Sequence, residues 1–125
     1  MDDLVRKDAL KIIERVIEIL KVKDEKDVFE LKDLSNHTIH NASVFQDECS
    51  VSIVVVIYAL SKIIERNPEQ LNYKKIIGFL QKSRSALKNN EDHSLKLAIR
   101  KLFSEISTID NKLSLYIHEV SMMHR

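Results

Sequence analysis

The sequence predicts an all-α fold, a bundle of five helices packed around a buried central helix at about residues 50–66. The stretch VSIVVVIYALSKII, residues 51–64, is apolar on nearly every side and therefore needs protein cover all round. It is too short for a bilayer, which takes about 20 residues. One glycine and one proline in 125 residues disfavour tight hairpins and favour long helices in one domain, residues 1–125.

The first two helices are predicted from apolar spacing. Apolar residues recur at intervals of three and four from Leu4 to Leu20, which indicates an amphipathic helix over about residues 3–22. A polar break follows, and a second amphipathic helix is expected over about residues 28–45.

The central segment can be interpreted as a strand or as a helix. Residues 52–57 are mostly β-branched and could form a strand by propensity. Nothing else in the chain offers that strand a partner, and the helical flank ALSKIIER continues the segment, so we favour a helix. Asn67 should end it, because the residue before a proline avoids the helical region. Pro68 is then expected as the first residue of the fourth helix.

The last segment has the clearest periodicity. The fourth helix should close at residues 89–92, Asn-Asn-Glu-Asp. From about 92 to 124 the apolar residues alternate gaps of four and three, which predicts one long helix with a heptad seam. A break at residues 107–110, where several side chains could cap a new helix, is the competing interpretation. The unbroken heptad phase favours one helix.

This last helix predicts self-association. It would be about 50 Å long, whereas the central helix reaches about 26 Å, so the bundle could cover only half of the seam. An uncovered apolar strip favours a homodimer related by a two-fold axis. The predicted dimer interface consists of Ile109, Leu113, Tyr116, Ile117 and Val120.

Charge is unevenly distributed along the chain, although the formal net charge is only +1. Residues 1–50 carry 8 basic and 12 acidic side chains, and residues 51–125 carry 12 and 7. No acid lies between Glu69 and Glu91, so the fourth helix forms a basic ridge that could follow phosphates. The alternative, which we favour, is a solvated face that balances the acidic first two helices. The candidate nucleic-acid-binding residues are Lys74, Lys75, Lys82 and Lys88.

The second predicted helix carries side chains that can bind metal. Two histidines three residues apart share a face with one aspartate a turn earlier and another two turns later. Imidazole and carboxylate at such spacing can share a divalent metal, with His93 or His118 as an extra ligand. The stripe lies opposite the apolar face, so we favour a solvated or partner-contact face instead. The candidate metal ligands are Asp33, His37, His40 and Asp47.

Cys49 is the only cysteine, which excludes an intrachain disulfide and favours a reducing compartment. The N-terminus MDDLVRKDAL lacks the apolar core of a signal peptide, so we expect a cytoplasmic protein. Asp47 and Glu48 disfavour a thiolate at Cys49, which is expected to pack as a small side chain rather than act as a nucleophile.

Two resemblances bear on function. The predicted fold, a small helical bundle with polar inner residues, is similar to the HEPN-type ribonucleases, whose mark is an arginine followed within six residues by a histidine. Arg84 precedes His93 by nine residues, which counts against membership of this ribonuclease family. Separately, residues 31–66, which include LSNHTIHNASVFQDE, resemble archaeal helical domains that precede a small helix-turn-helix segment. That resemblance includes no motif of known chemistry and implies the N-terminal part of a longer prokaryotic regulator.

The sequence therefore predicts a non-enzymatic interaction and oligomerisation domain, with a second copy of the chain as the expected partner and nucleic acid as a further candidate partner. The rival hypothesis is a metal-dependent or acid–base enzyme that uses the His37/His40 face of the second helix.

Overall fold

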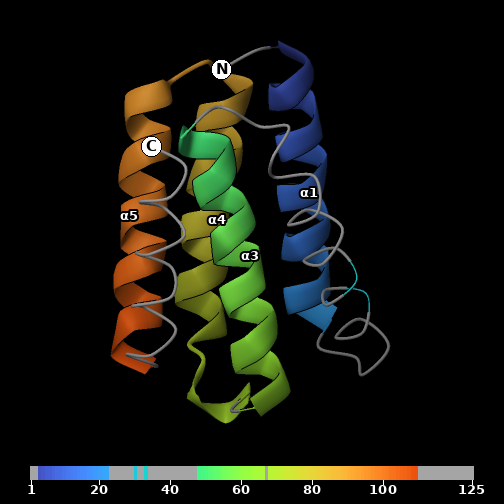
Figure 1. Ribbon diagram of the computed structural model, residues 1–125, viewed down its shortest axis with the longest axis vertical. Coiled ribbons are helices and arrows are strands. Elements are labelled where there is room, and N and C mark those ends of the chain that lie inside the picture. The colour runs from blue at the N-terminus through green and yellow to red at the C-terminus, as the bar shows by residue number, and fades with distance from the viewer. Residues whose placement is uncertain (1–2, 23–29, 31–32, 34–47, 67, 110–125) are drawn as a thin grey trace.

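The computed structural model describes residues 3–22, 30, 33, 48–66 and 68–109 (Figure 1). These residues form α1 (Asp3–Val22), α3 (Glu48–Arg66), the single 3-10 turn η2 (Pro68–Gln70), α4 (Tyr73–Lys88) and α5 (Asp92–Ile109), with no strand among them. The all-α prediction is confirmed. Only residues 30 and 33 of the second predicted helix are described, and both are helical. The rest of that helix, the continuation of the last helix toward residue 124 and hence the count of five lie outside the described residues.

The four α-helices lie side by side with their long axes roughly aligned (Figure 1). Helices α1, α3 and α5 run in one direction and α4 runs in the opposite direction. Helix α4 packs most extensively against α5 and α1, and α3 covers the other side by contacting α5 and α1. Antiparallel α4 and α5 are joined by a short turn, so their outer surfaces form one continuous face.

Helix α1 has the predicted bounds, because its apolar spacing extends to its last turn. Ala9, Ile13, Val16 and Leu20 are buried in the shared core, whereas Val22 at its end is 66% exposed.

Helix α3 is the buried centre that the sequence predicts. From Val55 to Ile64 every side chain is buried except those of Tyr58 and Lys62, which are half-buried. The hydroxyl of buried Ser61 donates to the carbonyl of Tyr58 at 2.7 Å, so its polar group is satisfied within the helix.

The connection between α3 and α4 differs from the prediction. Pro68 does not open the fourth helix, because it begins the separate turn η2, and α4 starts only at Tyr73. Leu71 between them is buried, so the connection itself contributes to the core. The helix restarts at Asn72, whose side-chain oxygen accepts a hydrogen bond from the backbone N–H of Lys75 at 3.2 Å.

The turn between α4 and α5 falls at residues 89–91, within the predicted stretch 89–92, whose last residue begins α5. The Asn89 N–H donates to the Ser85 carbonyl at 3.0 Å, and the Glu91 N–H donates to the Ala86 carbonyl at 2.9 Å. Asn90 has a φ of 57°, the left-handed conformation that asparagine tolerates better than most residues. These bonds satisfy the last carbonyls of α4 and reverse the chain.

The buried residues of α5 are four members of the predicted heptad seam and one further residue, Ala98. They are Leu95, Ala98, Ile99, Leu102 and Ile106. The helix continues through residues 107–109, the first part of the segment where a break was the competing interpretation. In the part of the chain that the structure describes, no helix is both long and apolar enough to cross a membrane.

Candidate interaction surface

The predicted basic ridge lies on the exposed side of α4. Helix α4 buries Ile76, Leu80 and Leu87, and this apolar stripe turns its lysines toward solvent. The four exposed lysines are Lys74, Lys75, Lys82 and Lys88. Because α4 contains no acidic residue, no partner for them comes from their own helix.

Two of these four lysines form ion pairs with glutamates of neighbouring helices. Lys88 Nζ lies 3.6 Å from Glu14 Oε1 of α1, and Lys75 Nζ lies 3.3 Å from Glu105 Oε2 of α5. The Lys88 pair agrees with the alternative that basic residues of α4 balance acids in the first half of the chain. Lys74 and Lys82 have no acidic partner among residues 3–22, 48–66 and 68–109.

A hollow of about 400 Å³ opens on α4 around Gly78. Lys74 and Lys82 flank this glycine one turn away on either side, and Lys75 and Phe79 complete the wall with Asn72. A Cβ atom added to Gly78 would meet nothing within 4 Å. Gly78 also has no positive φ, so neither packing nor backbone conformation requires glycine there.

A second hollow of about 620 Å³ lies between α4 and α5 and adjoins the first. Gly78 and Lys82 line both. Its α5 side is formed in part by Leu97, which is 43% exposed, and by Lys101. The remaining lining residues are small or polar, namely Gln81, Ser85, Ala86, Glu91, Ser94 and Ala98. We call the two hollows together the α4–α5 groove.

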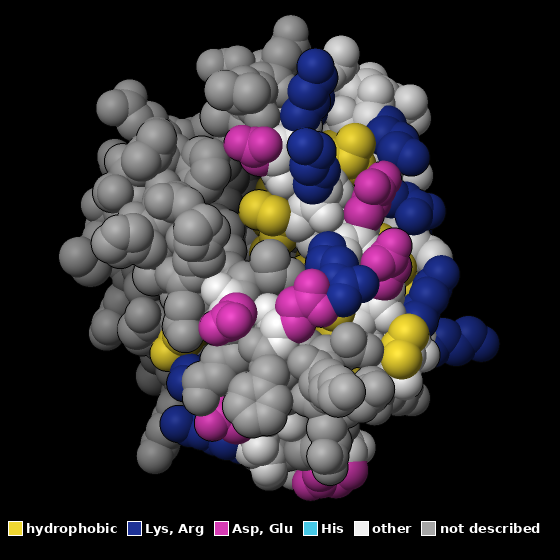
Figure 2. Space-filling view, turned by 90° about the vertical axis from the view of Figure 1, so that its right-hand side faces the viewer, with side chains coloured by type: hydrophobic (Ala, Val, Ile, Leu, Met, Phe, Trp, Pro, Cys, Tyr) yellow, Lys and Arg dark blue, Asp and Glu magenta, His cyan; other side chains and the backbone are white. Residues whose placement is uncertain are grey.

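The groove carries three lysines that lack an acidic partner in the described part of the chain, Lys74, Lys82 and Lys101. Lys101 is exposed, like Lys74 and Lys82. The acids occur toward the ends of the groove, where Glu91 lines the second hollow and Glu105 is held by Lys75. The α1 side of the molecule is different, because basic and acidic side chains are interspersed there (Figure 2).

The candidate metal residues are not brought together among the described residues. Asp33 is exposed, and His93 is exposed in the first turn of α5. His37, His40, Asp47 and His118 lie outside the described residues. Within those that are described, no three His, Cys, Asp or Glu side chains gather as a metal site would require.

The candidate dimer interface is described only at its first member. Ile109, the last residue of α5, is half-buried and packs against the core. Leu113, Tyr116, Ile117 and Val120 lie outside the described residues.

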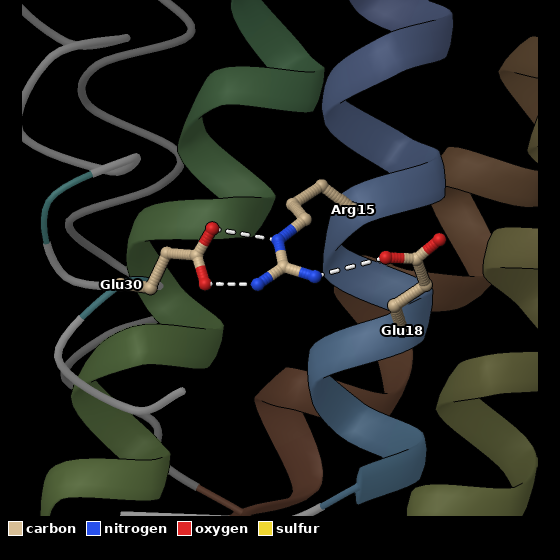
Figure 3. Close-up of polar contacts among 3 residues, drawn as sticks. All are labelled: Arg15, Glu18 and Glu30. Atoms are coloured by element: carbon tan, nitrogen blue, oxygen red, sulfur yellow. Dashed lines mark hydrogen bonds and ion pairs between the residues drawn. The ribbon is translucent and has the colours of Figure 1, made fainter. Parts of the chain in front are cut away.

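An ion-pair network on α1 was not predicted from the sequence (Figure 3). Arg15 Nε donates to Glu30 Oε1 at 2.6 Å, Arg15 Nη2 contacts the other carboxylate oxygen, and Arg15 Nη1 donates to Glu18 at 2.9 Å. Hydrogen bonding from Arg15 lowers the pKa of the Glu30 carboxyl, and the two carboxylates raise the pKa of Arg15. The network therefore links Glu30 to α1.

Sequence reasoning missed Gly78 and Lys101 as parts of a site. Gly78 carried a signal, because the single glycine of the chain stands inside a helical pattern where alanine would be more stable. Lys101 precedes the buried seam residue Leu102, and only the antiparallel packing of α5 on α4 brings it to the groove.

No protein-family model, curated protein or solved structure matches the chain.

Proposed function

We propose that this chain is a non-enzymatic helical interaction domain that binds the phosphates of nucleic acid through the α4–α5 groove. One observation carries the proposal. Three exposed lysines without acidic partners in the described chain, Lys74, Lys82 and Lys101, line two adjoining hollows that share Gly78 and Lys82.

Unpaired lysines on an open surface are suited to phosphate contacts. The lysine ammonium is a point charge that can approach any phosphate oxygen without reading a base. Each phosphate that a lysine neutralises releases a counterion, and this release supplies most of the free energy of non-specific binding. Cations already paired with carboxylates, such as Lys88 with Glu14, contribute less because the existing pair must first be broken.

The test replaces the three groove lysines together, as Lys74→Gln/Lys82→Gln/Lys101→Gln. We expect wild type to bind a fluorescent 20-base-pair duplex at low salt and the triple variant to bind it at least tenfold more weakly by fluorescence anisotropy. The logarithm of the wild-type association constant should also fall with the logarithm of salt concentration, with about 0.9 of the slope coming from each lysine–phosphate contact.

A matched control separates the groove from overall charge. Lys7→Gln/Lys11→Gln/Lys21→Gln removes the same three charges from exposed lysines of α1. This variant should keep most of the wild-type affinity. A wild-type protein that gives no anisotropy change at low salt, or two triple variants that lose affinity equally, would contradict the proposed function.

A further inference from the structure

We infer that the partner of the α4–α5 groove is a double-stranded nucleic acid, whose sugar–phosphate backbone lies along the groove and comes closest to the protein at Gly78. This inference rests on the proposed function and narrows it from nucleic acid in general to a duplex contacted through its backbone.

The aromatic residues argue for a duplex over a single strand. Proteins that bind single strands stack the unpaired bases on exposed aromatic rings. The four aromatic residues that the structure describes, Tyr58, Tyr73, Phe79 and Phe103, are only partly exposed and pack against the core. Phe79, which borders the groove, is approached by Lys82 Nζ at 5.9 Å from its ring centroid. Among the described groove residues, several lysines offer charge to a partner, whereas Phe79 is the one aromatic side chain and is half-buried.

The position of Gly78 argues for close approach by a bulky backbone. Glycine is a poor residue inside a helix, and neither a neighbouring atom nor a positive φ accounts for it here. What its missing side chain provides is open space between Lys74 and Lys82. A phosphodiester backbone can enter that space and meet a lysine on each side.

The spacing of the charges fits an extended partner. Lys74 and Lys82 are eight residues apart, about 12 Å along the helix axis, and Lys101 stands on the neighbouring helix. A single phosphate cannot span that distance, whereas a duplex carries one charge per about 1.7 Å of its axis. Lysine point charges in the hollow favour contacts with phosphates over bidentate reading of bases, so binding should be insensitive to sequence.

The test adds a side chain at Gly78 without removing a charge. Gly78→Gln should fold with a melting temperature no lower than that of wild type, because the new Cβ has free space and glutamine favours helix. Its affinity for a 20-base-pair DNA duplex should fall at least fivefold. Its affinity for a 20-nucleotide single strand without self-pairing should change less than twofold, because a flexible strand can pass around the added side chain. Ser104→Gln adds similar bulk at an exposed position of α5 that does not line the groove, and should alter neither affinity.

Each outcome separates this inference from the proposed function. The inference is supported if wild type binds the duplex more tightly than the single strand and if Gly78→Gln lowers the affinity for the duplex alone. If the lysine triple variant loses binding while Gly78→Gln keeps its duplex affinity, or if wild type binds the single strand as tightly, the inference fails and the proposed function stands. If an acidic amphipathic helical peptide displaces the duplex at equal charge concentration, the groove is a protein-docking site, with Leu97 as its apolar anchor, and the inference is overturned. If wild type binds neither the duplex nor the single strand, the inference and the proposed function both fail.

Discussion

Arg6 joins three helices through one guanidinium group. Its Nη1 donates to the Leu87 carbonyl at the end of α4 at 3.3 Å, and its Nη2 donates to Asp92 at the start of α5 at 3.4 Å. The side chain is only 14% exposed, and its buried Nε has no hydrogen-bond partner among the residues that the structure describes. A cation is favourable at the C-terminal end of a helix, where unpaired carbonyls concentrate negative charge. Arg6 therefore fixes the α4–α5 turn against α1.

Arg6→Ala should lower the free energy of unfolding by about 1–3 kcal/mol, because it leaves the Leu87 carbonyl and Asp92 without their partner. Urea denaturation at neutral pH measures the change. Lys7→Ala, one residue further along and exposed, should cost less than about 0.5 kcal/mol. Equal effects of the two substitutions would show that the Arg6 contacts do not stabilise the fold.

Glu30 makes part of the stability dependent on pH. Arg15 lowers the pKa of Glu30 in the folded chain, so the pair stabilises the fold above the ordinary glutamate pKa of about 4.3 and loses this effect as pH falls through the lower folded value. Urea midpoints should therefore be higher for wild type than for Glu30→Gln at pH 7 and should converge below pH 4. The Arg15 and Glu30 side chains are 40% and 39% exposed, so 1 M salt should also reduce the difference. A constant difference across this pH range would contradict the assignment.

At the scale of elements, sequence periodicity predicted the parts of the fold that depend on apolar faces. Helix α1, the burial of α3 and the seam of α5 follow directly from apolar residues at helical spacing. The start of α4 could not be predicted from this spacing. The preference of Pro68 for a first helical turn is local, whereas the burial of Leu71 is a tertiary effect. The pairing of Arg15 with Glu30 was equally out of reach, since the sequence does not say which carboxylate a surface arginine meets.

The buried centre of α3 gives a direct stability prediction. Ile57 is 1% exposed within the core, so Ile57→Ala removes three buried carbons and leaves a cavity. We expect the free energy of unfolding to fall by about 2–5 kcal/mol in thermal or urea denaturation. Val22→Ala, which truncates a side chain that is 66% exposed, serves as the control and should have little effect. An unchanged unfolding curve for Ile57→Ala would refute the central placement of α3.

At the scale of the whole molecule, the sequence predicted which helix is basic but not the shape of the basic surface. The exposure of the α4 lysines follows from the apolar stripe on the opposite side of the same helix. The groove arises only when α5 packs antiparallel to α4, which brings Lys101 beside Gly78 and pairs Lys75 with Glu105. That combination depends on residues more than 20 positions apart, and no local pattern contains it.

Self-association remains a prediction from the heptad pattern beyond Ile109. Leu113→Asp/Val120→Asp puts charge into the predicted seam and should convert a homodimer into a folded monomer. Light scattering at tens of micromolar measures the mass, and circular dichroism shows whether the bundle stays folded. A monomeric wild-type protein would defeat this prediction and would leave the α4–α5 groove unaffected.

The central claim is that the α4–α5 groove is the surface that meets nucleic acid, and amide chemical shifts can map that contact residue by residue. On titrating a DNA duplex into isotope-labelled protein at low salt, we predict saturable shifts concentrated at residues 74–85 of α4 and 94–101 of α5. The exposed face of α1 around Lys7, Lys11 and Lys21 should stay unshifted. Shifts concentrated on α1, or no saturable shift at any described residue, would contradict the account.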